Sequence, residues 1–294
     1  MLQFLMGILE QGFIFGIMGI GVYLTYKILD FPDLSVEGTF PLGASISASL
    51  IFNGVNPFLA CIISFIGGCL AGILTGVLNV KFKITNLLSG ILVMTALYSI
   101  NIRVMMGKPN VVIYNSIFSS EIPTMVILTI FIIVCKLLID YFLSTKLGYA
   151  LKVTGDNPQL VTSLGINIGT VKIIGVSLSN GFVALSGAIL AQSQSFSDVG
   201  MGSGIIVIAL GSIIIGTSML SKVNILKPTT KVIAGTIIYR GVIAFALGRG
   251  LRASDVKMAS AIILVAILAL NKYKFKIPRK KVGDAGSAEV EQYI

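Results

Sequence analysis

The sequence predicts an all-α, polytopic membrane protein with about eight to ten transmembrane helices, broken or re-entrant ones included. Of its 294 residues, 55% are hydrophobic and 12% are charged, and its mean hydropathy is +0.96. A soluble domain carries about 25% charged residues, so this chain has too few to cover a surface in water. The segments Gly38–Val80 and Ile173–Ser197 contain no Asp, Glu, Lys or Arg. Such continuous apolar runs favour membrane-spanning helices over the short alternating segments of a β-barrel.

Nine apolar segments are expected to form the helices. Thr39–Phe52 and Gly204–Leu220 are short and interrupted by glycine. This is typical of helices that border a transport pathway, and equally of short helices buried by their neighbours. Pro32 predicts a broken helix before the second segment, because proline disrupts a helix interior. In order, the segments are Phe4–Lys27, Thr39–Phe52, Pro57–Val80, Ile84–Asn101, Ile122–Phe142, Lys172–Ala191, Gly204–Leu220, Lys231–Leu247 and Met258–Asn271.

Basic residues indicate the orientation of the chain, whose net charge is +10. A cluster from Lys272 to Lys281 follows the last apolar segment, and the positive-inside rule places it in the cytoplasm. Nucleic-acid binding is the competing interpretation, and the position directly after a membrane segment disfavours it. We therefore expect a transmembrane domain at 1–271 with a cytoplasmic loop at 144–171, and a basic cytoplasmic tail at 272–294.

The remaining loops alternate with this orientation, with one exception. The segments Asn101–Glu121 and Gln192–Ser203 are expected outside, and the side of the N-terminus is not assigned. The loop after Leu247 is also predicted outside, yet it holds three basic residues against one acidic residue. The loops expected in the cytoplasm hold Lys81 and Lys83, Lys146 and Lys152, and Lys222 and Lys227.

The loop at 144–171 contains the signature of a short helix. Asp156 or Asn157 can cap its N-terminus, Pro158 suits its first turn, and Gly165 suits its end. Its leucines and valine are predicted to share one face, and an apolar face on a helix beneath a membrane favours docking into a partner's groove. A surface connector without a partner is the alternative. The residues of this signature are Gly155, Asp156, Asn157, Pro158, Leu160, Val161, Leu164 and Gly165.

Polar residues within or beside the apolar segments are candidates for a solute pathway, because polar groups inside a bilayer are costly and often functional. Hydrogen bonding between helices is the alternative for each of them. Arg240 is an isolated cation that is expected to pair with Asp or Glu, or else to attract a substrate carboxylate. Lys136 and Asp140 are expected to pair along one helix. The pathway candidates are Asp33, Ser35, Glu37, Asn86, Ser89, Thr95, Tyr98 and Asn101.

Several kinds of chemistry lack the residues that they need. The chain contains no histidine, and its cysteines, Cys61, Cys69 and Cys135, do not have the spacing of metal ligands. No catalytic residue and no metal site are therefore predicted. The chain also lacks a Gly-x-x-x-x-Gly-Lys-Ser/Thr phosphate loop, so it is not expected to hydrolyse ATP itself.

The stretch Gly148-Tyr-Ala-Leu-Lys-Val-Thr-Gly-Asp-Asn-Pro158, followed by Leu-Gly-Ile166, resembles the coupling-helix loop of ATP-binding-cassette (ABC) importer permeases of the branched-chain amino acid and ribose type. Asp33-Leu-Ser35 resembles a motif near their first broken helix, although Glu37 stands where ribose-type members usually have glycine. Other segments resemble a narrower branch that is paired with tryptophan- or tyrosine-type binding proteins. These segments are Thr85–Arg103, Gly107–Asn110, Phe196–Gly211 and Ile238–Arg240.

The resemblance implies a type II-like importer permease in the bacterial plasma membrane. It implies a homodimer, a separate ATPase dimer that binds ATP and Mg²⁺, and an extracytoplasmic solute-binding protein, with no cofactor on this chain. The expected solute is a small molecule, namely an amino acid and within that class an aromatic one. An ion-coupled secondary transporter, a channel and a membrane enzyme are the alternatives. The absence of carboxylates from the long apolar runs counts against the ion-coupled transporter. The cytoplasmic helix counts against a channel, and the absence of histidine counts against a membrane enzyme.

Overall fold

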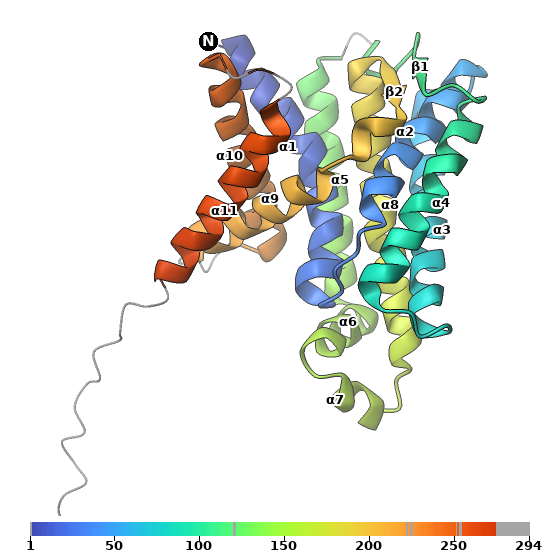
Figure 1. Ribbon diagram of the computed structural model, residues 1–294, viewed down its shortest axis with the longest axis vertical. Coiled ribbons are helices and arrows are strands. Elements are labelled where there is room, and N and C mark those ends of the chain that lie inside the picture. Colours follow the sequence, from blue (N-terminus) through green and yellow to red (C-terminus); the bar gives the residue numbers. More distant parts are fainter. Residues whose placement is uncertain are drawn as a thin grey trace, which may run out of the picture.

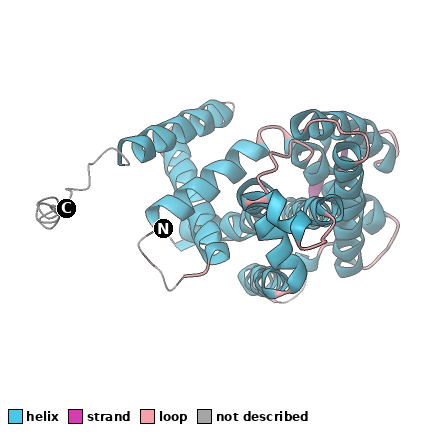
Figure 2. Cartoon of the chain, turned by 90° about the horizontal axis from the view of Figure 1, so that it is seen from below, coloured by secondary structure: helices cyan, strands magenta, loops and turns pink. Residues whose placement is uncertain are grey.

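The computed structural model describes residues 2–119, 122–221, 223, 226–250, 252 and 255–274, so most of the predicted basic tail lies outside the described residues. Almost the whole described ribbon is helical (Figure 2). The helices are α1 (Leu2–Tyr23), α2 (Val36–Phe52), α3 (Pro57–Val80), α4 (Asn86–Val104), α5 (Thr124–Ser144), α6 (Lys146–Asp156), α7 (Pro158–Ser163), α8 (Ile168–Gln194), α9 (Ile205–Met219), α10 (Pro228–Gly248) and α11 (Val256–Lys274).

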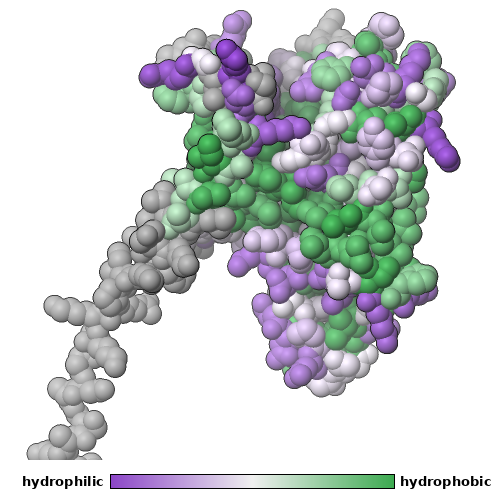
Figure 3. Space-filling view, viewed as in Figure 1, coloured by the Kyte–Doolittle hydropathy of each residue, from purple (hydrophilic) through white to green (hydrophobic). Residues whose placement is uncertain are grey.

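Each of the nine predicted apolar segments forms a helix, which confirms the all-α membrane fold. Seven helical segments of the described chain are long and apolar enough to cross a bilayer. Val36–Phe52 and Val256–Ala266 are shorter apolar helices. Hydrophobic side chains form a broad band across the middle of the molecule, between more hydrophilic ends (Figure 3). The hydrophobic band has the character expected of a surface that faces lipid.

Local signals in the sequence account for the helix boundaries. The third helix begins at Pro57, as predicted, because proline suits the first turn and the Asn56 side chain accepts a hydrogen bond from the Phe58 amide at 2.9 Å. The break predicted around Pro32 is also present. Helix α1 passes into a π-helical turn, Leu24–Ile28, and the chain then leaves the helix with Asp30 at a φ of 51°.

Helices α2 and α9 are half-helices: each begins inside the molecule after a non-helical stretch, and they run toward opposite ends of it (Figure 1). The chain turns back into the molecule after α1 before α2 begins. After α8 it turns back again through strand β2 (Phe196–Asp198) and a 3₁₀ turn (Val199–Gly202) before α9 begins. These two helices correspond to the two short, glycine-interrupted segments of the sequence.

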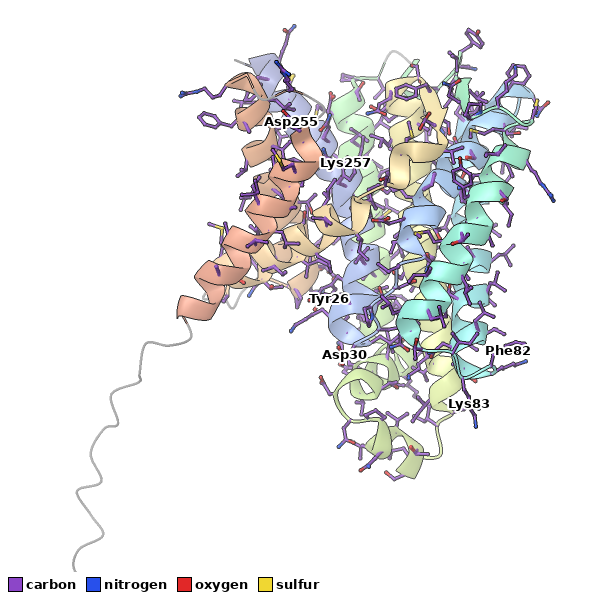
Figure 4. All side chains as sticks on the ribbon, viewed as in Figure 1. Tyr26, Asp30, Phe82, Lys83, Asp255 and Lys257 are labelled. Carbon is purple, nitrogen blue, oxygen red and sulfur yellow. The ribbon has the colours of Figure 1, made fainter. Side chains whose placement is uncertain are left out.

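The two ends of the molecule follow the predicted alternation of loops. Strand β1 (Asn110–Val112) pairs antiparallel with β2, with Val111 opposite Ser197, so the two loops expected outside lie together. Helices α6 and α7 lie at the opposite end, as does Lys83 (Figures 1 and 4). The N-terminus lies at the β1–β2 end, which the sequence did not assign. Lys257 lies toward that same end of α11, so the basic loop after Leu247 remains an exception.

Helix α8 occupies the centre of the bundle, and 78% of its apolar window is buried. Its neighbours approach closely at glycines: a Cβ at Gly43 of α2 would meet the Ala184 backbone, and one at Gly187 of α8 would meet the Phe40 backbone. Hydrogen bonds join the same helices, since Ser186 Oγ donates to the Ile14 carbonyl at 2.6 Å. Small residues and such hydrogen bonds hold helices together where lipid provides no hydrophobic driving force.

Replacement of Gly43 by alanine is therefore expected to destabilise the protein by about 1–3 kcal/mol, because the new methyl group has no space against the Ala184 backbone. The measurement is thermal unfolding of the purified protein in detergent. Gly7→Ala in α1 is the matched control, because a Cβ there meets nothing within 4 Å. Equal unfolding temperatures for the two variants would contradict the close α2–α8 packing.

Candidate functional site

The first helix break is fixed to α8 by a buried cluster of hydrogen bonds. Asp33 Oδ1 accepts from the Ser35 amide at 2.8 Å, and Asp33 Oδ2 accepts from Asn180 Nδ2 at 2.7 Å. Ser35 Oγ completes the cluster by donating to Asn180 Oδ1 at 3.2 Å. All three residues are buried. Asp33 and Ser35 thus satisfy polar groups of a non-helical segment in which Phe31, Asp33 and Ser35 are buried.

The second break repeats the local arrangement of the first. Asp198 Oδ1 accepts from the Gly200 amide at 2.7 Å, as Asp33 does from Ser35. The sequences Phe31-Pro-Asp-Leu-Ser35 and Phe196-Ser-Asp-Val-Gly200 share a Phe-x-Asp pattern, and each precedes a half-helix. Sequence reasoning missed this repeat, although the pattern was available as a signal. The repeat brings two half-helices of opposite direction into equivalent positions, as in many transporters.

The N-terminal ends of the two half-helices meet inside the molecule. Glu37, in the first turn of α2, accepts through Oε1 from the Gly204 amide at the start of α9, at 3.1 Å. Gly202 packs against the Glu37 carbonyl, where a side chain would have no space. Helix N-termini carry a partial positive charge, and the Glu37 carboxylate lies where the two half-helices converge.

A cavity of about 430 Å³ lies beside this meeting point, and we refer to it as the half-helix cavity. It is formed by the start of α2, the second half of α4 and the turn before α9. It brings together four of the eight predicted pathway residues: Glu37, Thr95, Tyr98 and Asn101. Its full lining is Glu37, Gly38, Pro41, Met94, Thr95, Tyr98, Ser99, Asn101, Val199, Gly200 and Ser203.

The four lining residues differ in exposure and partners. Tyr98 is 58% exposed, and Thr95 is exposed with its hydroxyl bonded to the Ile91 carbonyl of its own helix at 2.8 Å. Asn101 is fully buried, and its Nδ2 donates to the Gly38 carbonyl at 3.1 Å. The site therefore combines a half-buried carboxylate, an exposed phenol and a buried amide.

The other four predicted pathway residues do not line this cavity. Asp33 and Ser35 belong to the hydrogen-bonded cluster on α8. Asn86 Oδ1, at the start of α4, accepts from Asn79 Nδ2 at 2.7 Å. Ser89 is buried and bonds the Asn86 carbonyl at 2.9 Å. On α4, Ser89 precedes Thr95 by about 1.7 turns and Asn86 precedes it by about 2.5 turns.

The loop between α5 and α8 contains the predicted short helix, α7. Asn157 caps it, with its side chain 3.3 Å from the Leu160 amide, and Gly165 ends it with a φ of 73°. The expected common apolar face is divided, however. Leu160 and Leu164 are 48% and 66% exposed, whereas Val161 is 1% exposed and packs inward. Neighbouring positions on a helix point about 100° apart, so a two-turn helix against the protein can bury one and expose the other.

Helix α6 links this loop to the first helix break. Gly155 packs against the backbone carbonyl of Ile28, where a Cβ would have no space. Ile28 is the last residue of the π-helical turn that precedes the break. Asp156 follows Gly155 and lines a cavity of about 460 Å³ at the same end, together with Lys27, Lys152 and Lys227. Helix α6 is thus in direct contact with the chain that leads into α2.

Two charged groups in the helices have structural partners. The predicted Lys136–Asp140 pair is confirmed at 2.8 Å, and Asp140 also accepts from Thr229 Oγ1 of α10 at 2.6 Å. The carboxylate partner expected for Arg240 is not among the ion pairs of the described residues. Its guanidinium instead lies 3.4 Å above the Phe15 ring, and Nη1 donates to Gln11 at 3.3 Å. An aromatic face and a neutral amide can accommodate a guanidinium without a counter-charge.

The sequence matches known transport proteins along most of its length. A family model described as "Branched-chain amino acid transport system / permease component" matches residues 4–270. The tyrosine transport system permease protein of Clostridioides difficile (strain R20291) is 47% identical over 277 residues, which are 94% of each chain. The ribose import permease protein RbsC of Escherichia coli (strain K12) is 25% identical over 289 residues, covering 91% of this chain and 85% of that protein.

A solved structure shares the fold. It belongs to a transporter described as being of the metal-chelate ABC type, in an inward-facing conformation, with a TM-score of 0.51 and 16% identity. The likeness covers 93% of this chain and 85% of the other. Because the family model extends from the first helix to the last, the chain belongs to the branched-chain amino acid transport permease family and is the multi-pass permease component of an ABC importer.

Proposed function

We propose that this permease translocates an amino acid of the aromatic class. The observation that carries the proposal is the half-helix cavity, in which Glu37 lies where the N-termini of α2 and α9 converge. Discontinuous helices that meet inside a membrane protein typically form its solute site. The exposed Tyr98 ring adds an aromatic surface to the same cavity. The related tyrosine permease supports the choice of an aromatic amino acid as the solute.

The proposed transporter is a homodimer of this chain in a bacterial plasma membrane. The end that holds α6 and α7 faces the cytoplasm, which also receives the basic tail at 272–294, and the β1–β2 end faces an extracytoplasmic solute-binding protein. This orientation agrees with the positive-inside rule for Lys83, Lys146 and Lys152. Solute is delivered at the β1–β2 end and is released toward α6 and α7 in an alternating-access cycle.

A separate dimer of ABC ATPases supplies the energy, and ATP and Mg²⁺ bind to those subunits. The proposed docking element is the segment from Gly155 to Gly165, of which Leu160 and Leu164 present apolar side chains to a partner. Closure of the ATPases would displace α7 and α6. The contact of Gly155 with Ile28 would carry that movement to the first helix break and so to the half-helix cavity.

The test is uptake of radiolabelled L-tyrosine into proteoliposomes that contain the permease, its ATPase and its solute-binding protein. Uptake that requires ATP and an intact ATPase supports the proposal. Uptake that continues without the ATPase would instead identify an ion-coupled carrier or a channel.

Substitution of Leu160 or Leu164 by aspartate is expected to reduce co-purification of the ATPase by about tenfold or more, because a charge replaces an apolar contact. Thr162→Asp is the matched control, since it places the same charge on the exposed opposite side of α7. Retention of the ATPase by the leucine variants would contradict the assignment of α7 as the docking helix.

The cavity is also expected to contain water. In a variant without the three native cysteines, Tyr98→Cys should react with a charged, membrane-impermeant thiol reagent. Leu92→Cys should not react, because Leu92 is 46% exposed on α4 outside the cavity lining and would face lipid. Equal labelling of the two positions would argue against an aqueous pathway along this face of α4.

A further inference from the structure

Asn101 offers the half-helix cavity a buried hydrogen-bond acceptor. Its Nδ2 donates to the Gly38 carbonyl at 3.1 Å, which fixes the orientation of the amide because a carbonyl can only accept. Its Oδ1 is buried and has no partner within the described part of the chain. A buried acceptor without a partner is unfavourable and uncommon in folded proteins. A ligand that donates a hydrogen bond would satisfy it.

Glu37 offers the same cavity a negatively charged acceptor. Its carboxylate accepts a hydrogen bond from the Gly204 amide, at the start of α9. A carboxylate can accept about four hydrogen bonds, so this one leaves capacity for a ligand. Two acceptors, of which one is charged, are best matched by a cation with several N–H groups. A primary ammonium group has three such donors and no acceptor.

Lys257 supplies the opposite charge beside the cavity. Its Nζ donates to Oγ of Ser203, a lining residue, at 3.1 Å, and it attracts the Glu37 carboxylate electrostatically. The Lys257 and Glu37 side chains are not joined by an ion pair among the described residues. Lys257 extends from α11 toward the end where the proposed solute enters (Figure 4). An anion and a cation held apart in this way complement the two ends of a zwitterion.

We propose that the half-helix cavity is a selectivity site within the permease that recognises the α-ammonium group of the solute through Glu37 and Asn101. Lys257 faces the solute carboxylate, and Tyr98 and Met94 border its side chain. This inference rests on the proposed import of an amino acid and adds that the permease itself selects for a zwitterion. A solute without an ammonium group would leave the Glu37 charge and Asn101 Oδ1 unsatisfied, and would be rejected for that reason.

Glu37→Gln in the complete importer tests the proposal. Glutamine retains an acceptor for the Gly204 amide but removes the negative charge. Because a hydrogen bond to a charged group is lost, L-tyrosine uptake is expected to fall about tenfold or more. The variant should still co-purify with the ATPase in the wild-type amount, since a variant that misfolds would not assemble with it. Glu10→Gln in α1 is the matched control, outside the cavity lining, and should transport normally.

A second measurement examines the permease–ATPase complex without the solute-binding protein. L-Tyrosine is expected to raise the unfolding temperature of the wild-type complex, whereas 3-(4-hydroxyphenyl)propionate, which lacks the ammonium group, should not. Glu37→Gln should abolish the effect of L-tyrosine.

The possible results separate the two proposals. Uptake of L-tyrosine by Glu37→Gln at the wild-type rate, or equal stabilisation by both compounds, would overturn the selectivity site and leave the importer function intact. A wild-type importer that takes up no amino acid would overturn the proposed function and the selectivity site together.

Discussion

The structure depends on one constraint: a chain inside a bilayer must satisfy its own backbone polar groups. Two segments leave the helical conformation within the bundle, and each is stabilised by an aspartate that accepts from a backbone amide two residues later. Asp33 is further bonded to Asn180 of α8, and Glu37 accepts from the start of α9. These contacts compensate for the hydrogen bonds that a continuous helix would have made.

The same contacts explain why α8 lies at the centre. It provides Asn180 to the first break, and its C-terminal end leads into the second. Half-helix α2 must approach α8 closely for the hydrogen bonds to Asn180 to form, and Gly43 and Gly187 lack the side chains that would prevent this approach. The close packing of α2 on α8 and the hydrogen bonds of the first break therefore depend on each other. The half-helix cavity is the space left where α2, α4 and α9 diverge.

The first helix break also lies between the contact with α6 and the half-helix cavity along the chain. The first break is preceded by a π-helical turn, a feature that is often found at functional sites. The turn contacts α6 through Gly155 on one side and leads to Glu37 on the other. Only eight residues separate Ile28, which packs against α6, from Glu37 at the half-helix cavity, so a short stretch of chain links the proposed docking element to the cavity.

The sequence by itself determined the helices, the break at Pro32, the capped helix α7 and the shared side of the β1 and β2 loops. These features follow from local causes: apolar length, caps, proline and the charge of short loops. The tertiary structure alone decided which candidate polar residues share a cavity, that Val161 faces inward, and that Arg240 lies on Phe15. It also decided the side of the N-terminus and the meeting of Glu37 with Gly204. These features depend on contacts between residues that are far apart in the chain. Hydrophobic periodicity and helix caps, in contrast, describe only the segment in which they occur.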